Sequence, residues 1–103
     1  MGVTNIAFFV YILICKDGSY YTGHTDNLEN RITEHKSGAI KGYTSSRLPV
    51  EIVFSQEFQT REEALENERK IKGWSRKKKE AMIRGDWHEV SRLASDKLIS
   101  RSC

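Results

Sequence analysis

The fold is decided by the stretch AFFVYILICKDGSYYTGH at residues 7–24, which holds a long apolar run, a turn signal and a second short run. Residues 7–15 are almost continuously apolar and rich in β-branched and aromatic side chains, which is typical of a strand covered on both faces. Asp17-Gly18 favours a turn, and residues 20–24 read as the returning strand of a hairpin. The stretch therefore predicts a central strand with an antiparallel neighbour.

The length of the hairpin loop decides whether Tyr11 and Tyr21 lie on the same face of the sheet. A two-residue loop would place the two side chains on opposite faces, whereas a three-residue loop or one bulge would place them together. A site that uses both tyrosines needs the second arrangement, so we predict it. Side chains on opposite faces would count heavily against such a site.

Capping patterns mark the starts of the helices. A hydroxyl or acidic residue followed three positions later by glutamate can satisfy free N–H groups of the first helical turn, and a glycine can end the helix. This pattern begins at Asp26, Thr60 and Asp86, and the first two helices end before Gly38 and Gly73. Ser75 opens a further helix through Arg84. Alternating apolar residues over 50–58 predict a third strand.

These elements, in the order β-β-α-β-α-α-α, predict an α+β fold in which helices flank a three-stranded antiparallel sheet. A chain of 103 residues can bury one small core, so we expect a single domain over residues 1–98 and a disordered tail over 99–103. The longest apolar run is too short to span a bilayer and lacks a basic leader and a cleavage site. We therefore expect a cytoplasmic protein that binds no membrane.

Charge is divided unevenly along the chain. Residues 1–68 carry 6 basic and 10 acidic groups, whereas residues 69–103 carry 11 basic and 4 acidic groups. A run of cations alone is more often a solvated helix face, but beside a site for phosphate chemistry it indicates a surface that binds a polyanion. The run consists of Arg69, Lys70, Lys72, Arg76, Lys77, Lys78 and Lys79.

Five residues together form a candidate site for cutting a phosphodiester. Tyr11 and Tyr21 lie in the predicted strands, and Arg31 and His35 share one stripe of the first predicted helix. Glu68 lies among core-facing positions of the second helix, where a carboxylate needs a partner or a metal. Each residue alone has an ordinary structural explanation. Together they can activate water, hold a metal ion and neutralise a phosphate in its transition state.

These residues, in this order, resemble the GIY-YIG nuclease superfamily, and in particular its small stand-alone bacterial members. The chain departs from the two name-giving triplets, since it has Phe9-Val10-Tyr11 and Tyr21-Thr22-Gly23, but both tyrosines are kept. The matching segments are residues 10–13, 15–19, 21–25, 27–28 with Arg31 and His35, 43–50, and 64–74.

The resemblance implies hydrolysis of a nucleic-acid phosphodiester assisted by one divalent cation. Tyr11 matches the tyrosine that helps deprotonate the attacking water, and Tyr21 matches the one that orders the site by hydrogen bonding. Arg31 matches the essential arginine, whose planar fork can hold charge on the phosphoryl oxygens. His35 matches a histidine that, in part of the superfamily, assists the tyrosine as base or proton relay.

The resemblance also implies where the metal binds. Glu68 matches the lone carboxylate that holds it, and Gly23 matches the glycine that leaves room near the phosphate. A single carboxylate completed by water and substrate oxygens suits Mg²⁺ or Mn²⁺, so we expect one ion that binds weakly without nucleic acid. We expect no small-molecule cofactor.

Substrate contacts are expected from the loop over residues 38–49, which could contact a phosphate backbone through four side chains: Lys41, Tyr43, Thr44 and Arg47. The chain shows no added recognition domain, so we expect weak sequence reading by a monomer. Single-stranded or structurally irregular DNA is then favoured over a long duplex palindrome, because exposed bases can stack on Tyr43 or Trp74 without groove readout. We expect DNA rather than RNA as the substrate.

Two alternatives remain open from the sequence. The first is a catalytically silent nucleic-acid-binding module of the same fold, which would bind in a salt-sensitive manner and give no product. The second is a protein-interaction domain, which would prefer acidic protein to nucleic acid. Repair, recombination and processing of foreign DNA all remain possible roles for an active enzyme.

Overall fold

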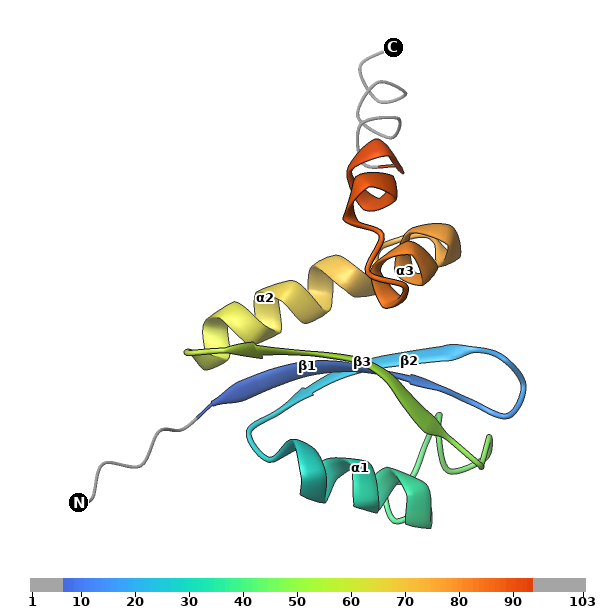
Figure 1. The fold of residues 1–103 in the computed structure, drawn as a ribbon. Coiled ribbons are helices and arrows are strands. Elements are labelled where there is room, and N and C mark those ends of the chain that lie inside the picture. Colours follow the sequence, from blue (N-terminus) through green and yellow to red (C-terminus); the bar gives the residue numbers. More distant parts are fainter. Residues whose placement is uncertain (1–6, 94–103) are drawn as a thin grey trace, which may run out of the picture. The chain divides into compact units, whose positions relative to one another are not determined.

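A computed structural model describes residues 7–93, and it contains a three-stranded antiparallel sheet with helices (Figure 1). This confirms the predicted α+β fold. The elements are β1 (Phe8–Ile14), β2 (Tyr20–Thr25), α1 (Leu28–Ser37), β3 (Glu51–Phe58), α2 (Arg61–Lys72) and α3 (Arg76–Ile83), followed by a helical segment over 87–93.

The chain divides into two compact units, one that ends at Lys72 and one that begins at Gly73. The first unit contains the sheet, α1 and α2, and the second contains α3 and the helical segment over 87–93. The single domain expected over residues 1–98 stays a prediction, and the tail expected at 99–103 lies outside the described residues. Over residues 7–93, no helix is both long and apolar enough to cross a membrane.

The central position of β1 organises the first unit. It pairs with β2 on one side and β3 on the other, and α1 and α2 cover opposite faces of the sheet (Figure 1). Tyr11 and Leu13 pack toward α1, where they meet Leu28 and Ile32, while the intervening Ile12 is fully buried on the other face. The prediction of a strand covered on both faces is confirmed.

The hairpin between β1 and β2 has the register that a two-tyrosine site needs. The Cys15 N–H donates to the Ser19 carbonyl at 2.8 Å, which leaves a three-residue loop, and Gly18 closes it with a φ of 84° that glycine adopts without strain. Leu13 lies opposite Tyr21, so the Tyr21 side chain shares a face with Tyr11, and the two ring centroids are 6.4 Å apart. The predicted register is confirmed.

One predicted helix cap was wrong by a single residue. The cap of α1 is Asn27, whose side-chain oxygen accepts from the Asn30 N–H at 3.1 Å, and not Asp26. Asp26 and Asn27 are both good capping residues, and the helix begins late enough for the second to reach a free N–H. Gly38 ends α1 in the left-handed conformation at a φ of 80°, as predicted.

The remaining caps agree with the sequence. Before α2, the Glu63 N–H donates to the Thr60 hydroxyl at 3.1 Å, and the Thr60 N–H donates back to the Glu63 carboxylate at 3.3 Å. Ser75 caps α3 by accepting from the Lys78 N–H. Asp86 accepts from the Glu89 N–H at 3.1 Å, at the start of the helical segment over 87–93.

Shortening Ile12 tests the role of β1 as the centre of the first unit. Ile12 is 0% exposed, so Ile12→Ala should lower the free energy of unfolding by about 2–5 kcal/mol through lost burial and a residual cavity. Glu57→Ala, at an exposed position of β3, is the matched control and should change it by less than about 0.5 kcal/mol. Chemical denaturation measures both, and equal effects of the two substitutions would contradict this assignment.

Candidate active site

The centre of the site is Tyr11, which lies opposite Gly23 in the sheet and is only 2% exposed. A Cβ atom on Gly23 would lie 2.6 Å from the Tyr11 hydroxyl oxygen and 2.8 Å from Cζ, which is closer than side chains pack. Glycine is therefore required here so that the Tyr11 side chain can lie over β2. The structural role of Gly23 is thus to make room for Tyr11. The expected role of Gly23 in leaving room for a phosphate stays a prediction.

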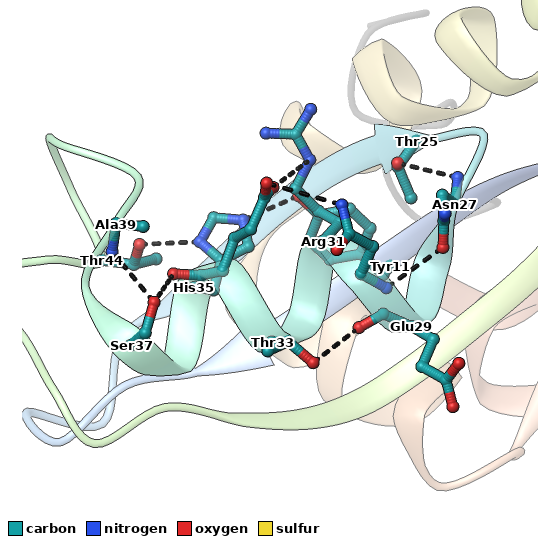
Figure 2. A network of polar contacts seen from close by, with 12 residues as sticks. Tyr11, Thr25, Asn27, Glu29, Arg31, Thr33, His35, Ser37, Ala39 and Thr44 are labelled. Atoms are coloured by element: carbon teal, nitrogen blue, oxygen red, sulfur yellow. Dashed lines mark hydrogen bonds and ion pairs between the residues drawn. The ribbon is translucent and has the colours of Figure 1, made fainter.

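A chain of hydrogen bonds joins the side chains of Tyr11, His35 and Thr44 inside the first unit (Figure 2). The Tyr11 hydroxyl lies 2.9 Å from Nε2 of His35, and Nδ1 of His35 lies 2.8 Å from the Thr44 hydroxyl. The three side chains come from β1, α1 and the loop after α1, and all are buried. Thr44 was expected to contact a phosphate backbone, and its hydrogen bond to His35 was not predicted.

Burial keeps both rings of this pair neutral. It raises the pKa of the Tyr11 hydroxyl above its ordinary value, Tyr21 and Glu68 raise that pKa further, and the Arg31 charge opposes them. Burial also lowers the pKa of His35, and Arg31 acts in the same direction. At neutral pH the pair is thus a phenol and an uncharged imidazole, an arrangement that can pass a proton without holding a fixed charge.

Arg31 lies on α1 with its side chain 41% exposed. Its nearest acidic neighbour is Glu34, whose Oε1 lies 4.0 Å from the Arg31 Nε, a distance too long for a strong ion pair. The guanidinium therefore keeps most of its hydrogen-bonding capacity for another anion. The charge of Arg31 acts on both Tyr11 and His35, since it lowers the pKa of each.

Glu68 on α2 is buried and holds two partners. Its Oε2 accepts from Lys72 Nζ at 2.6 Å, and its Oε1 is in close contact with Nδ1 of His24. Burial alone would raise the pKa of the Glu68 carboxyl, but the hydrogen bonds from Lys72 and His24 bring it below its ordinary value. The carboxylate is thus ionised, and the expected need for a partner is confirmed. His24 was not predicted.

The donor set at Glu68 is small. Among residues 7–93, no three histidine, cysteine, aspartate or glutamate side chains come close enough to hold a metal ion together. The residues present nevertheless fit a divalent cation, since an ionised, largely buried carboxylate already binds the Lys72 ammonium and has an imidazole beside it. Such a cation would take most of its ligands from water and substrate oxygens.

Aromatic side chains continue from the buried pair toward the surface. The Tyr21 ring centroid lies 5.2 Å from that of His35 and 6.1 Å from that of Tyr43. The Arg47 guanidinium lies over the Tyr43 ring at 3.8 Å and donates to the Asp17 carboxylate at 3.1 Å. A base that stacks on Tyr43 would need ring surface that Arg47 already uses, so Arg47 itself is the outermost group of this stack.

The predicted cation surface is divided between the two compact units. Arg69 and Lys70 are exposed on α2, while Lys72 on the same helix binds Glu68. Lys41 is exposed in the loop after α1. The other predicted cations belong to the second unit, where Lys78 lies over the Trp74 ring and Arg76 pairs with Glu80; they are Arg76, Lys77, Lys78 and Lys79.

Comparison with known proteins confirms the expected family resemblance. Residues 7–81 match the model of the GIY-YIG catalytic domain. A UPF0213 protein of Staphylococcus saprophyticus is 45% identical over 75 residues, which cover 73% of this chain and 92% of that protein. The UPF0213 protein YazA of Bacillus subtilis is 44% identical over 80 residues, which cover 78% of this chain and 80% of YazA. These names state no reaction.

Two solved structures share the fold. The solution NMR structure of the UPF0213 protein BH0048 from Bacillus halodurans has a TM-score of 0.51 and 44% identity, and the match covers 76% of this chain and 83% of that one. The solution NMR structure of the protein EF2693 from E. faecalis has a TM-score of 0.54 and 40% identity, and the match covers 77% of this chain and 84% of that one.

Gly23→Ala should show whether the Tyr11 side chain needs a glycine beneath it. The added methyl group would overlap the Tyr11 ring, so we expect a loss of about 1–3 kcal/mol in the free energy of unfolding. Leucine at residue 11 lacks the overlapping atoms, so the same alanine substitution should cost much less in a Tyr11→Leu background. Denaturation of the four proteins of this double-mutant cycle measures the coupling, and additive effects would exclude the overlap.

The buried His35 should make stability depend on pH. Burial lowers the pKa of folded His35 from its ordinary value of 6.5, so the unfolded chain binds the proton first as the pH falls. The contribution of His35 to the free energy of unfolding is therefore complete above pH 6.5 and is lost as the pH falls toward the folded-state pKa. The free energy of unfolding should fall by up to about 1.4 kcal/mol per pH unit in that range. His35→Gln should flatten this part of the profile, and an unchanged slope would mean that another group titrates.

Proposed function

The chain belongs to the GIY-YIG family, and on that premise we propose that it is a metal-dependent endonuclease that hydrolyses nucleic-acid phosphodiester bonds. One observation carries the proposal. The buried Tyr11–His35 hydrogen bond lies where the charges of Arg31 and Glu68 both act on the Tyr11 hydroxyl. Tyr11, His35 and Arg31 would supply a proton acceptor and an anion-binding group from β1 and α1, and the charge of Glu68 acts on the Tyr11 hydroxyl from α2. These are the kinds of group that phosphodiester hydrolysis requires.

In the proposed reaction, Tyr11 and His35 handle the proton of the attacking water. The Tyr11 hydroxyl accepts this proton as it passes its own to Nε2 of His35, while the water oxygen bonds to phosphorus and the bond from phosphorus to the leaving oxygen breaks. The pKa of the Tyr11 hydroxyl is raised, so transfer in one step with His35 is favoured over a free phenolate. The leaving oxygen takes its proton from solvent.

Arg31 supports this reaction through charge. Its exposed guanidinium can bind two phosphoryl oxygens as negative charge builds on them. Arginine suits this role better than lysine because its planar fork matches the geometry of the phosphate. Tyr21 packs between His35 and Tyr43 and would keep the relay ordered.

Glu68 would hold the metal, with His24 and Lys72 as its present partners. We propose one Mg²⁺ or Mn²⁺ ion, which when bound would supply Lewis-acid stabilisation of the phosphate oxygens. Because Lys72 binds one carboxylate oxygen, a metal must compete with an ammonium, so binding without nucleic acid should be weak.

The proposed substrate is DNA in single-stranded or structurally irregular form. Arg47, anchored by Asp17, and Lys41 in the same loop would contact the strand beside the Tyr21 ring. Arg69 and Lys70 on α2 would add phosphate contacts. Repair, recombination or processing of foreign DNA would each use this activity, and a monomeric state and a cytoplasmic location stay predictions.

A second candidate function is a silent nucleic-acid-binding module of the same fold. The observation that favours it is the state of Glu68, whose two oxygens are already engaged by His24 and Lys72. If these partners are not displaced, the carboxylate is unavailable to a metal. The module would then bind nucleic acid in a salt-sensitive manner without turnover.

Glu68→Gln separates the two functions. We expect wild-type protein with Mg²⁺ or Mn²⁺ to cut some members of a labelled panel of single-stranded, duplex, flapped and branched DNA and matching RNA, and EDTA to stop it. Glu68→Gln should lower the rate by about a hundredfold or more, since metal stabilisation is worth several kcal/mol, while binding measured by gel shift is largely kept.

Glu66→Gln is the matched control, because Glu66 lies exposed on the same helix. It should cut at the wild-type rate. Equal cleavage rates for Glu68→Gln and wild type would contradict the proposal that Glu68 holds the metal. Retention of the substrates by wild type without any cleavage would favour the binding module.

A further inference from the structure

Both ring nitrogens of His35 have a hydrogen-bond partner, and both partners are hydroxyl groups. Nε2 lies 2.9 Å from the Tyr11 hydroxyl and Nδ1 lies 2.8 Å from the Thr44 hydroxyl. A neutral imidazole has one N–H and one lone pair, so one hydroxyl must donate to the ring and the other must accept from it. The proposed relay requires the lone pair at Nε2, facing Tyr11.

We propose that Thr44 is a positioning residue that holds His35 in the tautomer with its proton on Nδ1. In this arrangement Tyr11 donates to Nε2, and the Nδ1–H of His35 donates to the Thr44 oxygen. The inference rests on the proposed function for its catalytic consequence, but not for the tautomer itself.

Chemistry favours this arrangement over its reverse. A phenol, with an ordinary pKa of about 10, is a stronger hydrogen-bond donor than an aliphatic alcohol, and its oxygen is a poorer acceptor because a lone pair is delocalised into the ring. The better donor, Tyr11, therefore faces the imidazole lone pair, and the better acceptor, Thr44, faces the N–H.

The position of Thr44 is fixed by contacts of its own loop. The Arg47 N–H donates to the Thr44 carbonyl at 3.0 Å, and the Arg47 carbonyl accepts from the Lys16 N–H at 2.9 Å. The Arg47 side chain also donates to Asp17, in the hairpin loop. The loop that carries Thr44 is thus tied to the β1–β2 hairpin, and the Thr44 side chain is only 2% exposed.

This arrangement also suits the reaction. When Tyr11 passes its proton to Nε2, His35 becomes a cation with an N–H at each nitrogen. The Nδ1–H bond to Thr44 is kept unchanged through the step, so no group in the buried relay has to turn. Thr44 supplies orientation and a neutral acceptor, and it does not itself touch the reacting atoms.

The tautomer can be measured directly by NMR. Long-range ¹H–¹⁵N correlation spectra of uniformly ¹⁵N-labelled protein at neutral pH distinguish a protonated from an unprotonated ring nitrogen. We expect Nδ1–H for His35 in wild type and in Thr44→Ser, which keeps the hydroxyl. Thr44→Val has nearly the same shape but no acceptor, so the Nε2–H form should dominate. Thr33→Val, on the exposed side of α1, should leave the signals unchanged.

The outcomes separate this inference from the proposed function. An Nε2–H signal in wild type overturns the inference even if the protein cuts DNA, and an Nδ1–H signal in wild type and in Thr44→Val alike also overturns it. If the expected tautomers are found in a protein that cuts no substrate, the tautomer assignment holds and the proposed nuclease function is contradicted. In an active protein, Thr44→Val should lower kcat by about tenfold to a hundredfold with KM little changed, and Thr44→Ser should recover most of it.

Discussion

The site depends on one constraint: the hydroxyl of Tyr11 is buried and must find a hydrogen-bond partner inside the first unit. The side chain reaches His35 only because Gly23, opposite it in the sheet, has no Cβ atom to block it. His35 then needs a second partner for its other nitrogen, which Thr44 supplies. Core packing and polar satisfaction thus hold in place the same groups that the proposed reaction uses.

Charge is arranged around this neutral pair. Arg31 is exposed and only loosely paired, whereas Glu68 is buried and closely paired with His24 and Lys72. In the proposed reaction, the anion-binding group, Arg31, has only a weak partner to give up. The proposed metal ligand, Glu68, would have to exchange the Lys72 ammonium for the metal.

Much of this could be predicted from local sequence patterns. The apolar run over 7–15 and the Thr60–Glu63 box act over a few residues, so the strands and most caps follow from them. The loop sequence allows two hairpin registers, and the observed one was predicted only because a site that uses both tyrosines needs it. The cap at Asn27 was missed because the adjacent Asp26 is an equally good capping residue. Patterns that act over short distances leave such one-residue choices open.

The supporting residues could not be predicted because they depend on contacts between distant parts of the chain. His24 meets Glu68 across 44 positions, and Thr44 meets His35 through a loop that has no regular periodicity. The alternation of β2, which places His24 on the face opposite Tyr21, was the only signal for the first. The cation run over 69–79 is continuous in sequence, but it is divided between two compact units.

The most direct measurement is a crystal structure of the protein with Mn²⁺ and a short single-stranded DNA that carries an uncleavable phosphorothioate. The account predicts an anomalous peak for manganese at the Glu68 carboxylate, and a phosphate held between the Arg31 guanidinium and the Tyr11 hydroxyl. A manganese ion bound away from Glu68, or DNA that lies on the protein with no phosphate near Tyr11, would contradict it.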